Sequence, residues 1–150
     1  MTFRFRPRYR GVAWTSIAVG GSLSTIATLV GFIAVPLAAG AIGVMLGAAY
    51  LASSTWRLRV VADEIGFEVG SSSRARFRLT WSEVTKVIVS PTTHTCFVDG
   101  GDPSRSLLIP GVGAPAPYDI ENRAALVDFI LAHVSSERIQ TVETLESVTR

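Results

Sequence analysis

The chain has 150 residues, 48% of them hydrophobic, and a net charge of +2 that is unevenly divided. Residues 1–56 carry four arginines and no acidic residue, whereas residues 57–150 carry ten basic and twelve acidic residues. Because nucleic-acid binding needs a dense cationic surface on the folded domain, this distribution argues against a nucleic-acid partner.

The first ten residues contain all the charge of the N-terminal part. We expect residues 1–10 to form a basic leader in the cytoplasm, just before the membrane. Its cations would anchor the chain at the membrane interface together with two tryptophans, since indole rings favour that region. The predicted interface anchors are Arg4, Arg6, Arg8, Arg10, Trp14 and Trp56.

Residues 11–56 form an uninterrupted run of 46 residues without Asp, Glu, Lys, Arg or His. One crossing of the hydrocarbon layer needs about 20 apolar residues, so the run predicts two crossings and a short turn. Pro36 and Gly40 are the natural helix breakers near its middle, which places the predicted turn near residues 34–40. The sequence therefore predicts a transmembrane helical hairpin over residues 11–56.

Arginines flank both ends of this run, and the intervening turn has none. The positive-inside rule then predicts a two-span protein of the inner (plasma) membrane with both termini in the cytoplasm. A cleaved secretory signal is the alternative, because Ala39-Gly40-Ala41 resembles a cleavage site and cleavage would release an exported domain. The apolar run is longer than the 7 to 15 residues of a signal core, which favours the uncleaved hairpin.

Gly43 and Gly47 have the spacing that lets helix backbones approach closely. They indicate either a homo-oligomer interface or packing between the two helices of one hairpin, and the second is the more general use of small residues in membranes. Neither predicted span carries a charged or histidine side chain, which argues against a pump or an ion-coupled transporter.

After Trp56 the apolar pattern changes to alternation, which is typical of half-buried strands. We predict a two-residue turn at Asp63-Glu64, with Ala62 opposite Ile65 and Arg59 opposite Glu68. One amphipathic helix, with Asp119 as its N-cap, then closes a domain at residues 57–134, and residues 135–150 form a polar tail, either a frayed helix or disordered. The predicted strands lie within residues 57–60, 65–69, 74–79, 86–89, 95–98 and 105–109.

Three sequence features together resemble a known family. They are Trp56-Arg57-Leu58-Arg59-Val60 after the hairpin, the acidic turn before Gly66, and Arg78-Leu79-Thr80-Trp81-Ser82-Glu83-Val84 before a valine-rich strand. The chain resembles the bacterial pleckstrin-homology-like (bPH) domains, most of all the actinobacterial low-molecular-weight protein antigen 6 type. This resemblance implies an α+β membrane protein in which a PH-like bent sheet or partly open barrel with one C-terminal helix follows two spans. It implies no reaction.

The residues that could carry chemistry are few. Cys96, His94 and His133 do not supply a four-ligand zinc site, and two side chains two apart on a strand do not by themselves make an activated nucleophile. The glycine loops lack the patterns of phosphate-binding motifs. We therefore predict no enzyme activity, no metal and no cofactor.

The remaining candidate is a set of arginines on the first and third predicted strands. These possible lipid-facing or partner-facing residues are Arg57, Arg59, Arg74, Arg76 and Arg78. The leading hypothesis is a membrane-anchored interaction or scaffolding module that binds a protein partner. The alternative is a sensor of anionic lipid surfaces that uses these arginines, against which stands the acidic Asp63-Glu64 turn at the place where PH domains that bind headgroups are usually basic.

Overall fold

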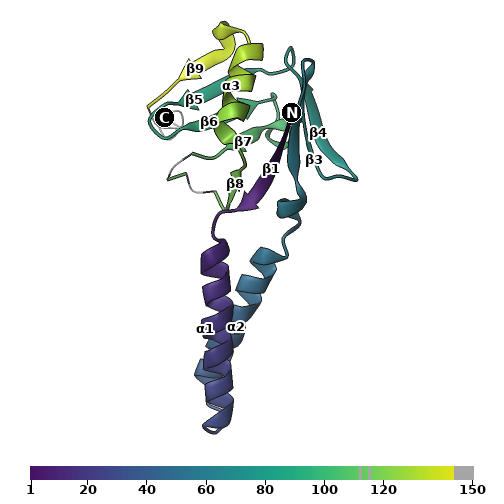
Figure 1. The fold of residues 1–150 in the computed structure, drawn as a ribbon. Helices are drawn as coiled ribbons and strands as arrows, with labels where there is room; N and C mark the ends of the chain where they lie inside the picture. The colour runs from purple at the N-terminus through teal and green to yellow at the C-terminus, as the bar shows by residue number, and fades with distance from the viewer. Residues whose placement is uncertain (112, 115, 144–150) are drawn as a thin grey trace. The chain divides into compact units, whose positions relative to one another are not determined.

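The computed structural model describes residues 1–111, 113–114 and 116–143. It shows an α+β protein with two apolar N-terminal helices, two sheets and a C-terminal helix (Figure 1). The chain divides into two compact units. Pro7–Ser54 forms the first, called the hairpin below, and Met1–Arg6 joins the chain from Thr55 onward in the second, called the sheet domain.

The hairpin consists of α1 (Arg10–Leu29) and α2 (Ala34–Leu51), both long and apolar enough to cross a membrane. The chain reverses at residues 30–33, where Gly31 and Phe32 have φ values of 126° and 57°. The prediction of a turn near residues 34–40 was therefore wrong. Pro36 lies in the first turn of α2, where a missing N–H group costs no intrahelical hydrogen bond.

Glycines mark the surface along which the two helices pack. A Cβ atom on Gly20 would lie 2.5 Å from the carbonyl oxygen of Gly40, and one on Gly47 would lie 2.7 Å from that of Ala13. A Cβ on Gly43 would lie 3.4 Å from the Ser16 oxygen. Gly43 and Gly47 therefore both face α1 of their own hairpin, where small residues allow the two backbones to approach closely.

Most hydroxyl side chains of α1 form hydrogen bonds within the hairpin. Four hydroxyl groups donate to the carbonyl oxygen four residues earlier, and Ser24 donates to the Leu37 oxygen of α2 at 3.4 Å. Such bonds leave few polar groups facing outward, as a helix in an apolar solvent requires. The four residues with bonds inside the helix are Thr15, Ser22, Thr25 and Thr28.

The first sheet of the sheet domain has the strand order β4-β3-β2-β1-β8. The β2, β3 and β4 strands form an antiparallel meander, whereas β1 comes from the start of the chain and pairs antiparallel with β2. Residues 1–10 are therefore not only a leader, because six of them form an internal strand of this sheet. The bounds are β1 (Thr2–Pro7), β2 (Arg59–Ala62), β3 (Gly66–Gly70), β4 (Ala75–Thr80) and β8 (Tyr118–Ile120).

The second sheet has the order β7-β6-β5-β9 and is closed by the helix α3 (Arg123–His133). Three of its strands form an antiparallel meander, and β9 pairs in parallel with β5. The strands are β5 (Lys86–Ser90), β6 (Thr95–Asp99), β7 (Leu107–Ile109) and β9 (Ile139–Thr141). The short 3-10 helices are η1 (Ser54–Arg57), η2 (Pro103–Arg105) and η3 (Ser136–Arg138).

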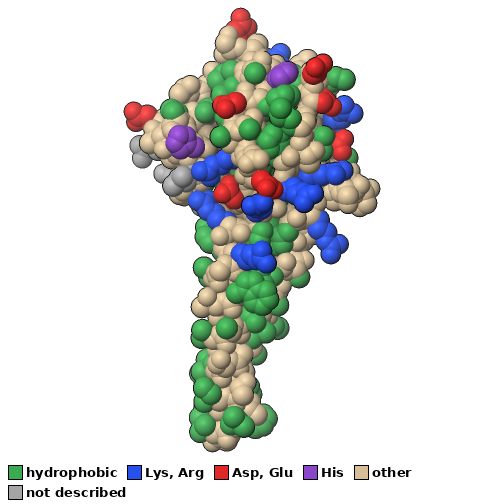
Figure 2. All heavy atoms as spheres, in the orientation of Figure 1, with side chains coloured by type: hydrophobic (Ala, Val, Ile, Leu, Met, Phe, Trp, Pro, Cys, Tyr) green, Lys and Arg blue, Asp and Glu red, His purple; other side chains and the backbone are tan. Residues whose placement is uncertain are grey.

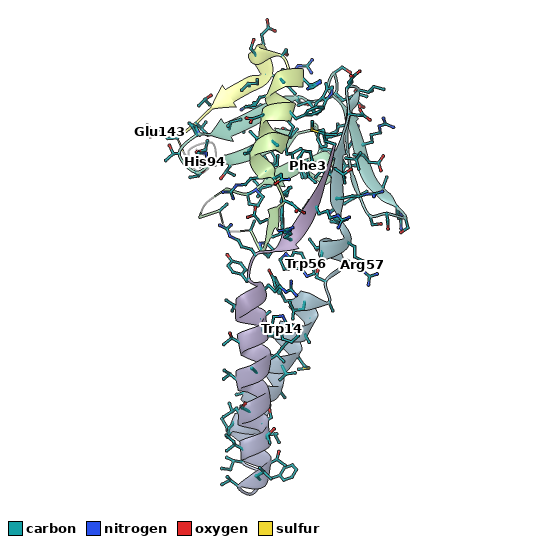
Figure 3. The ribbon with its side chains drawn as sticks, in the orientation of Figure 1. Phe3, Trp14, Trp56, Arg57, His94 and Glu143 are labelled. Atoms are coloured by element: carbon teal, nitrogen blue, oxygen red, sulfur yellow. The ribbon has the colours of Figure 1, made fainter. Side chains whose placement is uncertain are left out.

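One hydrophobic core joins the two sheets and α3. Phe3 and Phe5 of β1 enter it with exposed fractions of 5% and 6%, and Leu126 and Ile130 of α3 are fully buried. Figure 3 shows Phe3 pointing from β1 into the interior of the sheet domain. The N-terminal strand thus supplies two aromatic side chains to the core.

The structure corrects three further details of the sequence interpretation. Ala62 lies opposite Phe67, not Ile65, and Arg59 lies opposite Gly70, not Glu68, because the connection between these partners spans residues 63–66, two residues more than predicted, both on the β3 side. Tyr118–Ile120 is a strand, so the helix begins after Asn122 and Asp119 is not its N-cap. The predicted polar tail contains η3 and β9, and residues 144–150 lie outside the described residues.

Arg138 explains why this C-terminal segment is ordered against the second sheet. Its guanidinium group donates to the backbone oxygens of Trp81, Ser82 and Val84 at 3.4, 2.8 and 2.7 Å. The Ser90 hydroxyl also donates to the Glu143 oxygen at 2.5 Å. These bonds hold β9 beside β5, although the polar composition of this segment gives no local signal for a strand.

Candidate functional site: the basic end of the first sheet

The first sheet has a basic end and an acidic end, and antiparallel pairing explains why. The end of β1, the start of β2, the end of β3 and the start of β4 all meet at one end of the sheet. The turn between β2 and β3 lies at the other end. We define the basic end by the exposed arginines that the pairing places there, which are Arg4, Arg57, Arg59, Arg74 and Arg76.

Arg4 and Arg59 are direct cross-strand partners in the β1–β2 pair. Phe3 and Val60, the next pair, are buried, so alternation places both arginines on the outer face. Like charges directly opposite each other destabilise a sheet. Among the described residues, no carboxylate lies within ion-pair distance of either arginine.

Gly70 is the partner of Arg59 on the other side, in β3. The β3–β4 register shifts at this glycine, and a Cβ atom there would lie 2.7 Å from the Ala75 Cα atom and from the Arg74 oxygen. Only glycine fits such a close backbone approach without displacing a neighbour. Gly70 is therefore buried beneath the backbone at the start of β4, between Arg59 and the arginines of that strand.

Acidic residues near the basic end are few. Glu121 pairs with Arg6 at 2.5 Å, which neutralises this arginine of β1. Glu68 lies on the outer face of β3, two pairs farther from the basic end than Gly70, between Val61 and Arg78. Figure 2 shows basic side chains gathered toward one end of the sheet domain with a few acidic ones among them.

The opposite end of the sheet is acidic and internally satisfied. The Asp63 carboxylate accepts hydrogen bonds from the N–H groups of Ile65 and Gly66, both at 2.9 Å, and these bonds lower its pKa. Arg78 lies 3.6 Å from the same carboxylate. The structure therefore separates Arg78 from the other four predicted arginines, because it faces the acidic turn.

The Trp81-Ser82-Glu83-Val84 segment has a structural role in the same part of the domain. Glu83 accepts from the N–H group of Thr80 at 2.9 Å and from Arg105 at 3.0 Å, and these bonds lower its pKa to about 2. The Glu83 N–H donates in return to the backbone oxygen of Thr80, which closes a turn at this position. The Trp81 indole donates to the Asp63 oxygen at 3.1 Å, which braces the acidic turn.

The predicted interface anchors are divided between the two units. Arg4 and Arg6 belong to the sheet domain, and Arg8 and Arg10 belong to the hairpin. Trp14 is 55% exposed on α1, and Trp56 is half-buried in η1. The side chain of Arg57 extends outward from the segment that leads into β2 (Figure 3).

Sequence reasoning missed Arg4 as a member of the basic end. It treated the arginines of residues 1–10 as a leader and overlooked the alternation of Phe3-Arg4-Phe5-Arg6, which is the period of a half-buried strand. That signal was available in the sequence. The pairing of β1 with β2, which lies more than 50 residues away in the chain, could not be read from the sequence.

The residues considered for chemistry do not form a reactive site. Cys96 is fully buried, and burial raises the pKa of its thiol to about 12. His94 is exposed in the β5–β6 turn with a φ of 52°, and His133 stacks on Phe129 with the ring centres 4.3 Å apart. Within the described residues, no three His, Cys, Asp or Glu side chains cluster as metal ligands would.

Two hollows lie on the second sheet. One of about 250 Å³ lies between the β5–β6 turn and the start of α3, and its polar lining includes Ser90, His94 and Arg123. Another of about 620 Å³ lies along β9 and is lined by Lys86, Arg138 and Gln140 among others. Ser90 and Arg138 already donate to backbone oxygens, so one polar side chain of each hollow is engaged within the fold.

No family model, curated protein or solved structure that was compared with this chain matches it.

Proposed function

We propose that this protein is a non-enzymatic, membrane-anchored interaction module, with the hairpin in the inner membrane and a PH-like sheet domain at its cytoplasmic face. The single observation that carries the proposal is the pairing of β1, before the hairpin, with β2, after it. The hairpin is thus an insertion between two neighbouring strands of one sheet. Both of its ends are tied to the same folded domain.

This pairing favours permanent anchorage over export and release. Cleavage near Ala41 would remove β1 from its position between β2 and β8, together with two phenylalanines of the core. Each Phe-to-Ala truncation in a core costs about 3 to 5 kcal/mol, so loss of both side chains would remove much of the stability of a small domain. A domain that needs β1 is therefore expected to keep its hairpin.

The hairpin has the surface that lipid contact requires. Only 17% and 11% of the residues in the most apolar windows of its two helices are buried, so neither resembles the core helix of a water-soluble protein. Large exposed side chains along it include Val19, Ile26, Val35 and Leu46. Because the connection at residues 30–33 is short and uncharged, the hairpin is expected to return to the side from which it entered.

The arrangement of the sheet domain supports the PH-like interpretation. Two meanders, β2-β3-β4 and β5-β6-β7, contribute to two sheets around one core, and a C-terminal helix packs on that core. One fold hosts many functions, so the kind of partner does not follow from the fold. A protein partner in the membrane or the cytoplasm, and self-association, are therefore both compatible with this proposal.

Cysteine accessibility tests the anchored topology. We expect Gly31→Cys in the hairpin connection to react with a membrane-impermeant thiol reagent on intact cells, and Ser72→Cys in the sheet domain to react only after permeabilisation. The buried Cys96 provides a low background. Reaction of Ser72→Cys on intact cells would overturn the proposed sidedness, and N-terminal sequencing of a mature protein that starts after Ala41 would overturn anchorage.

Crosslinking in intact membranes, followed by purification of the whole chain, tests the interaction role. We expect a reproducible partner or a defined homo-oligomer that survives mild detergent. A strictly monomeric protein without any specific crosslinked species would contradict an interaction module.

A further inference from the structure

We propose that the basic end of the first sheet binds anionic phospholipid headgroups, with Arg4 and Arg59 as a paired site for one headgroup phosphate. This inference rests on the proposed function, because it takes the membrane of the hairpin as the source of the lipid. Arg78 is not part of this site, because it faces the acidic turn.

Arg4 and Arg59 form a pair of like charges without a compensating carboxylate among the described residues. Arg4 and Arg59 are exposed direct partners, and no described carboxylate pairs with either of them. By contrast, Arg6, Arg78, Arg105 and Arg123 each have a carboxylate within 3.6 Å. An anion between the two guanidinium groups would convert the cross-strand repulsion into two charge-assisted hydrogen bonds.

Two further arginines lie beside this pair. Gly70 follows Arg59 in the row across the sheet and is buried, because the backbone of residues 74 and 75 packs closely against it. The exposed Arg74 and Arg76 lie beyond it, just before and just after the first residue of β4. Guanidinium groups match the geometry of phosphate oxygens, so these two arginines strengthen the attraction of the pair for a phosphate group.

A further argument is the length of the connections. Five residues lie between Arg4 and the first residue of α1, and seven lie between the last residue of α2 and Arg59. Fully extended, the shorter connection spans roughly 20 Å, so only a short length of chain links Arg4 to α1. Such tethering makes even a weak attraction to the lipid surface effective.

The uneven distribution of charge along the first sheet also predicts how the sheet domain is oriented at the lipid surface. Asp63 and Glu64 lie in the turn at the opposite end of the first sheet, away from Arg4 and Arg59. An anionic leaflet attracts the basic end and repels the acidic turn, and the interaction falls off within a Debye length of about 10 Å at moderate salt. The sheet domain is therefore expected to dock with the basic end toward the lipid.

The experiment uses the full chain in nanodiscs of phosphatidylcholine alone or mixed with phosphatidylglycerol. A dye on Ser72→Cys, beside the basic end, reports docking through quenching by lipids with spin-labelled headgroups. Ser72 is exposed and Cys96 is buried, so the label is selective. We expect stronger quenching with the anionic lipid, and we expect high salt to reverse it.

The decisive variant is Arg4→Gln/Arg59→Gln, and Arg78→Gln/Lys86→Gln is its control with the same change in net charge. One juxtamembrane cation contributes about a fivefold effect, so the first variant is expected to lower the ratio of docked to undocked domain about 30-fold. The control is expected to change it less than twofold. Equal losses in both variants, or quenching that does not depend on lipid charge, would overturn the proposed site.

Stability provides a second readout. In neutral detergent, Arg4→Gln/Arg59→Gln is expected to have a Tm equal to or above that of the wild type, because it removes a repulsive pair. Addition of anionic lipid is expected to raise the wild-type Tm more than that of the variant. A lower Tm of the variant in neutral detergent would indicate a structural role and contradict the assignment.

A separate experiment, alkaline carbonate extraction, tests the membrane anchorage on which the headgroup site rests. Extraction of the chain from membranes by alkaline carbonate would show that the hairpin is not inserted, and the anchored module would then fail. A chain that resists extraction but shows no lipid-dependent quenching retains the anchored module and overturns only the headgroup site.

Discussion

The hairpin and the sheet domain bury opposite kinds of residues. Val12, Val19 and Val35 of the hairpin are 64%, 61% and 78% exposed, and its buried positions are glycines and alanines. In the sheet domain Val60 and Val87 are fully buried, and arginines cover the outer face of the first sheet. Large hydrophobic side chains are therefore exposed on the hairpin and buried in the sheet domain, as expected if the hairpin faces lipid and the sheet domain faces water.

Truncation of the two phenylalanines of β1 gives the largest expected effect and tests the boundary between the units. Phe3→Ala/Phe5→Ala is expected to destabilise the sheet domain by about 3 kcal/mol or more per residue, because both side chains lie in its core. Urea unfolding of the full chain in detergent, followed by near-UV circular dichroism, measures the loss.

The control for this variant is Val12→Ala/Val19→Ala, which truncates two exposed side chains of α1. We expect it to leave the unfolding midpoint of the sheet domain within experimental error. If the phenylalanine variant behaved in the same way, β1 would not be an essential strand of the domain.

Substitution at the helix contact gives the next largest effect. Gly40→Ala is expected to separate α1 and α2 at a cost of about 1 to 3 kcal/mol, because the added methyl group would meet the Gly20 oxygen and Ser24. The matched change Gly21→Ala has nothing within 4 Å of its Cβ position and is expected to gain helix stability of up to about 1 kcal/mol.

Amide hydrogen exchange of the hairpin in detergent distinguishes these two glycines. Gly40→Ala should lower the protection of α1 and α2 without changing that of β2 to β4, whereas Gly21→Ala should not. Equal protection in both variants would show that the helices do not depend on close approach at Gly40.

The smallest expected effect concerns the hydrogen bonds between Thr80 and Glu83. The pKa of Glu83 is lowered from 4.5 to about 2 in the folded state, chiefly by the hydrogen bond from the Thr80 N–H. A lowered folded-state pKa contributes stability that is present above about pH 4.5 and is lost as the pH falls toward 2. Glu83→Gln is therefore expected to lower the Tm slightly at pH 7.

Thermal melts of the full chain at pH 7, 4 and 2.5 measure this dependence. The difference in Tm between wild type and Glu83→Gln should shrink as the pH falls, since the wild type progressively loses the charged form. Glu64→Gln, at an exposed position without a described ion pair, is the control and should show no such trend. A difference that stayed constant with pH would contradict the role of the carboxylate.

Local patterns predicted much of the fold. Alternation predicted six strands, and all six are present as β2 to β7 with small differences in their bounds. The predicted β2–β3 register was wrong by two residues, yet Val60 and Phe67 are still buried, because a shift of two keeps each side chain on its face. The error arose because Asp63, which caps the turn with its side chain, extends the loop to Gly66.

The candidate site was predicted only in part. Arg57, Arg59, Arg74 and Arg76 do lie at one end of the first sheet, but Arg78 lies at the other and Arg4 was assigned to a leader. The missing information was the pairing of strands distant in sequence. A short strand such as β8 or β9 carries too few residues to show a periodic signal by itself.

The sequence by itself determined two apolar helices, the faces of six strands and the excess of arginine around the hairpin, because these follow from the order of neighbouring residues. Only the tertiary structure decided that β1 lies between β2 and β8, that the hairpin is an insertion in a sheet, and that Arg4 faces Arg59. Periodicity specifies which way a side chain points. Which strand lies beside another depends on core packing and on chain closure over long separations, and the local pattern does not encode either.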